Sequence, residues 1–148
     1  MGDRMKNDYQ IWNILHDGVL AEIKGDISGD LKIRVEIEYL ARKLKGRFSS
    51  IFVTLKNCSL FIYERYWTKD NVQIFTSPNE LEGITPAIVT LSCDEMDDHL
   101  LIDDICGSIK TRYDSAVLTL ENGDPLAFQE LDNISKEYWD NFGAKQDP

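Results

Sequence analysis

Residues 31–40 read LKIRVEIEYL, and this stretch decides what kind of fold the chain can adopt. Its apolar side chains stand at every second position: Leu31, Ile33, Val35, Ile37 and Tyr39. The positions between them are charged, so a strand here would bury one face and leave the other in water. That alternation is typical of an antiparallel sheet with one solvated face, rather than of a parallel sheet covered on both sides.

Apolar runs of strand length recur along the rest of the chain. They cover residues 19–26, 50–67, 87–93, 99–106 and 108–123. Short turn sequences join most of them, which predicts antiparallel pairing between neighbours in the chain. Within the second run, Lys56 and Asn57 indicate either a turn between two strands or a bulge in one long, bent strand. The last run reads as one long strand with a bend near Asp114 and Ser115.

Amphipathic segments at the two ends of the chain predict helices. Near the N-terminus, Ile11, Ile14 and Leu15 have the spacing of one helix face. Near the C-terminus the same period is followed by Ala127, Leu131, Ile134, Tyr138 and Phe142. Gly143 is expected to end this helix. We therefore predict a single α+β domain over residues 1–148. It would hold one antiparallel, meander-type sheet of about six to eight strands, with a short N-terminal helix and the C-terminal amphipathic helix packed on it.

The charge of the chain is strongly negative and unevenly distributed. The formal net charge is −10, which argues against binding to nucleic acid or to anionic membranes, since both need a basic surface. Nine acids and no Lys or Arg lie between Lys69 and Lys110, and the rest of the chain has 17 acids against 16 basic residues. One segment therefore carries most of the excess negative charge, which favours an acidic surface that binds a basic partner.

The stretch CDEMDDHLLIDD, residues 93–104, holds six of these acids: Asp94, Glu95, Asp97, Asp98, Asp103 and Asp104. We expect the first four to form the tip of a hairpin, and all six to serve as a docking surface for a basic protein. Glu80 and Glu82 would form its rim. Tyr66 and Trp67 are the expected aromatic anchors, because buried aromatic side chains hold a complex while charges at the rim mainly speed its formation. The alternatives are a solvated acidic surface without a partner, and a Mg²⁺ or Mn²⁺ site that includes His99.

Other sequence features favour a binding protein over an enzyme. Cys58, Cys93 and Cys106 match no zinc pattern and are expected to be reduced core residues of a cytoplasmic protein. Neither of the two histidines accompanies a nucleophile motif, and no nucleotide-binding fingerprint is present. We expect no catalytic residue, metal or cofactor, and find no signal peptide or membrane-spanning run.

The segment ILHDGVLAEIKGD, residues 14–26, contains His16-Asp17-Gly18 at the junction between the first helix and the first strand. A His–Asp pair can relay protons, but at this position a structural role in ending the helix and shaping the turn is favoured. With the alternating strands that follow, residues 14–65 resemble small bacterial proteins whose His-Asp-Gly or His-Asp-Ala turn leads into an antiparallel sheet. Several such families are immunity proteins of polymorphic toxin systems.

This resemblance implies a non-enzymatic cytoplasmic protein that neutralises a cognate toxin domain by direct binding. Many such toxin domains act on nucleic acid and are basic, which agrees with an acidic inhibitor. Binding surfaces diverge among immunity families, so the resemblance implies no particular contact residue. The residues alone leave open a carboxylate- or divalent-metal-dependent enzyme, and a structural or regulatory subunit.

Overall fold

The structure is a computed structural model that describes residues 10–16, 18–44, 48–68, 70–77, 88–95, 99–104 and 107–146. A helical turn over residues 10–14 comes first, and nine strands follow it within these ranges. The strands are β1 (Val19–Gly25), β2 (Leu31–Glu36), β3 (Ser50–Lys56), β4 (Leu60–Thr68), β5 (Asn71–Phe75), β6 (Ile88–Glu95), β7 (Leu100–Asp104), β8 (Gly107–Arg112) and β9 (Ser115–Leu120). The helices are α2 (Glu38–Ala41) and α3 (Phe128–Gln146).

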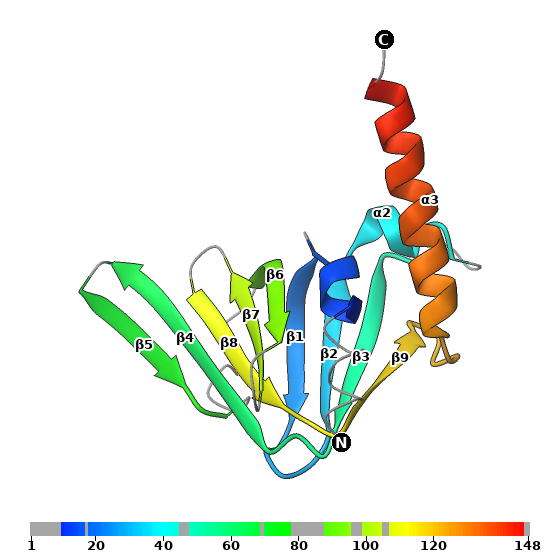
Figure 1. Cartoon of the computed structure of the whole chain (residues 1–148). Coiled ribbons are helices and arrows are strands. Elements are labelled where there is room, and N and C mark those ends of the chain that lie inside the picture. The colour runs from blue at the N-terminus through cyan, green and yellow to red at the C-terminus, as the bar shows by residue number, and fades with distance from the viewer. Residues whose placement is uncertain are drawn as a thin grey trace.

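All strand pairs are antiparallel, and the hydrogen-bonded order is β5-β4-β8-β7-β6-β1-β2-β3-β9 (Figure 1). Two groups of four strands, β1-β2-β3-β9 and β5-β4-β8-β7, meet at β6. This strand pairs with β7 at five positions but with β1 at only two. The predicted α+β class with antiparallel pairing is confirmed. The prediction of one meander of six to eight strands is wrong, because β3 pairs with β9 and β4 with β8, far along the chain.

A bent two-stranded ribbon explains this order. The chain bends between β3 and β4 at Asn57, whose φ is 52°, and β8 runs into β9 beside that bend. The amide of Ser59 donates to the carbonyl oxygen of Arg112 at 2.9 Å on one side. On the other side the amide of Asp114 donates to the carbonyl oxygen of Lys56 at 2.9 Å. Pairing thus continues through the bend, and the ribbon carries the chain from one group of strands to the other.

Strand β1 contains an irregularity that changes which of its side chains face the core. Simple alternation predicts that Val19, Ala21 and Ile23 share one face. The pairing with β2 instead shifts between Leu20 and Glu22, as in a β-bulge. Leu20 and Ile23 are therefore the buried residues of β1, while Val19 and Ala21 are only partly buried.

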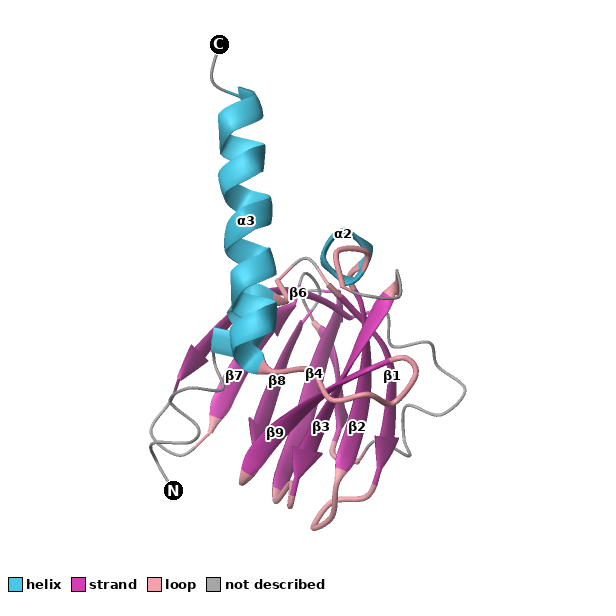
Figure 2. Ribbon diagram, turned by 90° about the vertical axis from the view of Figure 1, so that its right-hand side faces the viewer, coloured by secondary structure: helices cyan, strands magenta, loops and turns pink. Residues whose placement is uncertain are grey.

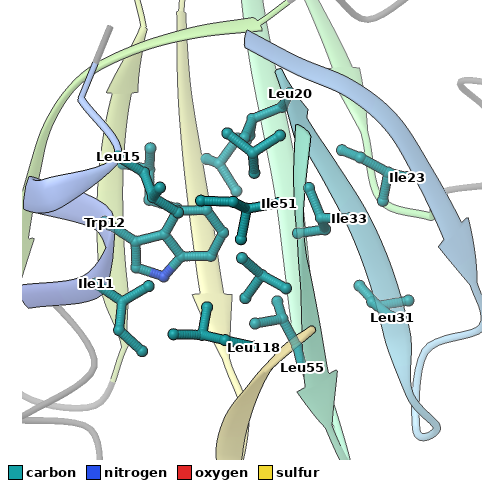
Figure 3. Close-up of a cluster of buried hydrophobic side chains, with 14 of the residues drawn as sticks. Ile11, Trp12, Leu15, Leu20, Ile23, Leu31, Ile33, Ile51, Leu55 and Leu118 are labelled. Carbon is teal, nitrogen blue, oxygen red and sulfur yellow. The ribbon is translucent and has the colours of Figure 1, made fainter. Parts of the chain in front are cut away.

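One cluster of buried side chains draws on both groups of strands and on the first helical turn. Figure 3 shows Trp12 within this cluster, together with side chains of β1, β2, β3 and β9. Trp12 is fully buried, and its indole Nε1 donates to the hydroxyl of Tyr113 at 3.2 Å. The first helical turn is thus a part of the core, with Trp12 as its largest contribution.

The two labelled helices depart from the predicted pattern. Strand β2 ends at Glu36, and Tyr39, predicted on its apolar face, lies in α2. Helix α3 runs on through Gly143. Leu131 of this helix is buried in the core, and Phe128, Ile134 and Tyr138 are partly buried against it. The C-terminal part of the helix projects away from the strands (Figures 1 and 2). The predicted packing of this helix therefore holds for the part from Phe128 to Tyr138.

Candidate partner-binding surface

The acidic hairpin predicted from residues 93–104 corresponds to β6 and β7, which pair side by side. Glu95 lies opposite Leu100 at the turn end, with Asp94 next to it on β6. Asp104 lies opposite Thr90 at the other end, four positions along β7 from Leu100, which corresponds to about 13 Å of strand. The acids therefore occupy two separate ends of the hairpin. Asp97 and Asp98, and the expected rim of Glu80 and Glu82, lie outside the described residues.

Register across the neighbouring strands decides which acids lie near the predicted aromatic anchors. Arg65 on β4 lies opposite Gly107 on β8, and Gly107 lies opposite Asp104 on β7. Tyr66 and Trp67 follow Arg65 on β4, so they lie at the same end of the sheet as Asp104 and Asp103. Two strand spacings, about 10 Å, separate these parts of the backbone. Asp94 and Glu95 lie toward the opposite end of the strands.

Sequence reasoning named Tyr66 but missed the exposed apolar row that it forms with Val72 and Ile74 on the β4–β5 hairpin. Tyr66 is 47% exposed, Val72 47% and Ile74 56%, and together we call these three residues the apolar row. Tyr66 pairs with Val72, and Ile74 pairs with Glu64, so all three share one face of the hairpin. The Tyr66 hydroxyl also donates to Glu64 Oε2 at 3.3 Å. The sequence signal for strand β5 is the alternation of polar and apolar residues in NVQIF, which follows the turn residues TKD. A run of five residues is a weak indication of a strand.

Strand β5 is exposed along most of its length, although one residue fixes it to the core. Its first four residues are exposed, whereas Phe75 is buried and stacks on Tyr63 with ring centroids 5.8 Å apart. As the first strand in the order, β5 forms an edge of the sheet (Figure 1). Edge strands are commonly protected by lysine or proline, and β5 contains neither. The apolar row is therefore held in place and open to solvent.

Two acids, Glu64 and Asp70, border the apolar row. Glu64 lies within the row's face, and Asp70 is exposed just before β5. Arg65 alternates with Glu64 and Tyr66 along the strand, so it belongs to the other face, and its Nε is buried. Lys110 lies opposite Ile62, four positions along β4 from Tyr66 but only two from Glu64 and on the same face, so one basic side chain also borders this surface. An apolar centre with carboxylates beside it is the arrangement that attracts a basic protein surface.

The structure supports a structural role for His16. Its Nδ1 lies 2.7 Å from the carbonyl oxygen of Asn13, and its ring stacks on Trp139 of α3 with centroids 5.4 Å apart. The hydroxyl of Tyr39 donates to the backbone oxygen of His16 at 3.3 Å. His16 thus joins the first helical turn to α2 and α3, and Asp17 lies outside the described residues.

The described part of the chain includes Cys58 and several possible metal-ligating side chains. There, no group of three or more His, Cys, Asp or Glu residues is placed to hold a metal ion. Cys58 is buried as predicted, and this burial raises the pKa of its thiol, which disfavours the reactive thiolate. Cys106 lies outside the described residues, and Cys93 lies on β6.

No family model, curated protein or solved structure matches this chain. Across the described ranges, none of the helices combines the length and the apolar character needed to cross a membrane.

Proposed function

We propose that this protein is a non-enzymatic, acidic binding protein that neutralises a basic toxin domain by direct contact, as a bacterial immunity protein does. The observation that carries the proposal is the apolar row of Tyr66, Val72 and Ile74, exposed at the edge of the sheet with Glu64 and Asp70 beside it. The resemblance of residues 14–65 to immunity proteins, centred on His16-Asp17-Gly18, agrees with it.

Residues at the centre and at the rim of a protein interface contribute differently to binding. Large side chains near the centre of an interface supply most of the affinity, and tyrosine is enriched among such anchors. Charges at the rim raise the rate of encounter and fix orientation. A partner that acts on nucleic acid must carry a basic face, which the acids of this chain complement. Covering that face would block the partner without any chemical reaction.

The test is co-expression with the product of the neighbouring gene in a host that this product kills. If the proposal is right, the chain restores growth and the two proteins co-purify in a fixed ratio. Tyr66→Ala should weaken the complex about tenfold or more by isothermal titration calorimetry, because it removes the anchor of the apolar row. Absence of both protection and a complex would contradict the proposed function.

A matched control separates the apolar row from general surface hydrophobicity. Val117 on β9 is 40% exposed, against 47% for Val72, and it belongs to the other group of strands. Val72→Asp should weaken the complex, whereas Val117→Asp should leave it unchanged. Equal effects of the two substitutions would exclude the β4–β5 hairpin as the binding surface.

A further inference from the structure

We infer that β5 receives an extended, basic segment of the partner as an additional strand, so that the partner continues the sheet beyond its edge. The inference rests on the proposed function, because it names how the same surface would hold the partner. It goes further in assigning the main-chain groups of Asn71–Phe75, and not side chains alone, to binding.

The first step of the argument is a contrast between the two edges of the sheet. Beyond β9, the returning chain covers the edge: the amide of Leu126 donates to Leu118 O at 3.0 Å, and Thr119 forms a bridge with Pro125. Strand β5 is the opposite end of the order, and no described strand lies beyond it. In an antiparallel pair, alternate residues direct their amide and carbonyl groups away from the neighbouring strand. Strand β5 therefore offers such groups along about 17 Å of edge.

The second step concerns side chains. A strand added beside β5 places every second side chain on the face of Val72 and Ile74. There these side chains would extend the apolar row, which already pairs Tyr66 with Val72 across the hairpin. The added segment should therefore carry aliphatic residues at alternate positions, as in known modes of strand addition.

The third step is the charge of the occupant. Asp70 is exposed directly before the first residue of β5. Glu64 is the residue opposite Ile74. A second copy of this chain would bring the same acids to the edge, and two chains of net charge −10 repel each other. Charge complementarity thus selects a basic segment from another protein.

The experiment titrates the full-length, isotope-labelled chain with an acetylated peptide about seven residues long, so that it spans β5. The peptide has valine at alternate positions to extend the apolar row, threonine between the valines, and lysine at both ends, because the exposed Asp70 directly precedes the strand. We expect amide chemical shifts to change at Tyr66 and over residues 71–75, with affinity that falls as salt is added. The peptide with glutamate in place of lysine should bind at least about tenfold more weakly, because it meets like charges. Equal affinity of both peptides, no binding of either, or shifts confined to other strands would overturn the inference.

Methylation of the peptide's own amides separates strand addition from side-chain docking without altering the protein. Two peptides are methylated on alternate amides, one on each set. If the peptide pairs with β5, one set faces the protein and its methylation should abolish binding, while methylation of the other set should be tolerated. Retained binding of both methylated peptides would overturn strand addition. The inference would also be overturned if light scattering showed that the free chain is a dimer and that Val72→Asp dissociates this dimer.

Failure of the inference and failure of the proposed function give different results. If the chain protects cells and a Val72→Asp, Ile74→Asp variant protects them equally, the immunity function stands and the β5 site is wrong. If the lysine peptide binds at β5 but the chain gives no protection, the binding edge stands and the immunity function is wrong.

Discussion

Trp12 and Tyr113 lie 101 positions apart in the sequence, and a hydrogen bond between their side chains joins the first helical turn to the end of β8. We expect Trp12→Ala to lower the free energy of unfolding by about 3–5 kcal/mol, because it leaves a large cavity in the core. Tyr113→Phe keeps the ring and removes the acceptor, so it should cost about 1 kcal/mol. Urea unfolding followed by circular dichroism measures both changes.

The hydrogen bond itself is tested by combining the two substitutions. In the Trp12→Phe background, Tyr113→Phe should cost less than it does alone, because the indole donor is already gone. Identical costs in the two backgrounds would mean that the bond contributes nothing to stability.

Glu121 shows how a surface carboxylate can make stability depend on pH. Its Oε1 accepts from the amide and hydroxyl of Ser49 at 2.9 and 3.0 Å, and from the amide of Ser50 at 2.7 Å. Burial by itself raises the pKa of Glu121, but the hydrogen bonds from Ser49 and Ser50 outweigh it and hold the pKa below the ordinary value of 4.5. A lowered pKa in the folded state stabilises the protein above the unfolded-state value. This contribution is lost as the pH falls through the folded-state value.

We therefore expect Glu121→Gln to lower stability at neutral pH by about 1 kcal/mol, a small effect because the carboxylate is exposed to solvent. The difference from the wild-type chain should shrink as the pH falls below 4.5, which chemical denaturation at several pH values would measure. Glu137→Gln on α3 controls for the loss of one negative charge. A difference that stays constant with pH would argue against the proposed role of the Ser49 and Ser50 hydrogen bonds.

At the scale of single elements, local pattern predicted most strands but not their partners or ends. The alternation of Leu31, Ile33 and Val35 is a property of one strand, and it is confirmed by their burial. The bulge after Leu20 depends on how β1 pairs with β2. The alternation of residues within β1 carries no information about that pairing. The β3–β9 and β4–β8 pairings depend on contacts made far along the chain, so the sequence pattern favoured a meander where the structure has a crossing ribbon.

Gly107 on β8 lies close to the backbone of β4. A Cβ atom at Gly107 would lie 1.9 Å from the carbonyl oxygen of Glu64, so Gly107→Ala must push the two strands apart. We expect a loss of about 1–3 kcal/mol or more in the free energy of unfolding, as for other overpacked sites. Thermal and urea unfolding would measure it. Gly29→Ala is the control, since its nearest atom, the Asp26 oxygen, would lie 3.2 Å away; equal losses would contradict the close approach.

At the scale of the whole molecule, the sequence predicted a concentration of acid but not its distribution in space. The interval between Lys69 and Lys110 is acidic by count, yet Glu95 and Asp104 lie at opposite ends of one hairpin. Counting along the chain cannot show this, because strand pairing turns neighbours in sequence into distant points. The same pairing brings Tyr66 to Val72 and Glu64 to Ile74, which no property of the separate residues reveals.

The charge around the apolar row should govern how fast a basic partner associates. We expect the double substitution Glu64→Lys, Asp70→Lys to slow association about tenfold at low salt and to flatten its dependence on salt, with a smaller effect on dissociation. Stopped-flow binding to the co-purified partner measures both rates. Two matched charge reversals on α3, Glu130→Lys and Glu137→Lys, should change the rate far less. Similar slowing by both pairs would mean that net charge alone attracts the partner.

The bent ribbon also governs the order in which the protein can be completed on the ribosome. Strand β3 gains its partner β9 only after Leu120, the residue opposite Ile51, has been translated. At about 5–20 residues per second, the nascent β3 waits on the order of several seconds for that strand. During this time the unpaired edge of β3 and its apolar side chains can form non-native contacts with other chains. Synthesis that stalls before Leu120 therefore releases a product inclined to aggregate, even though most of its strands have already been made.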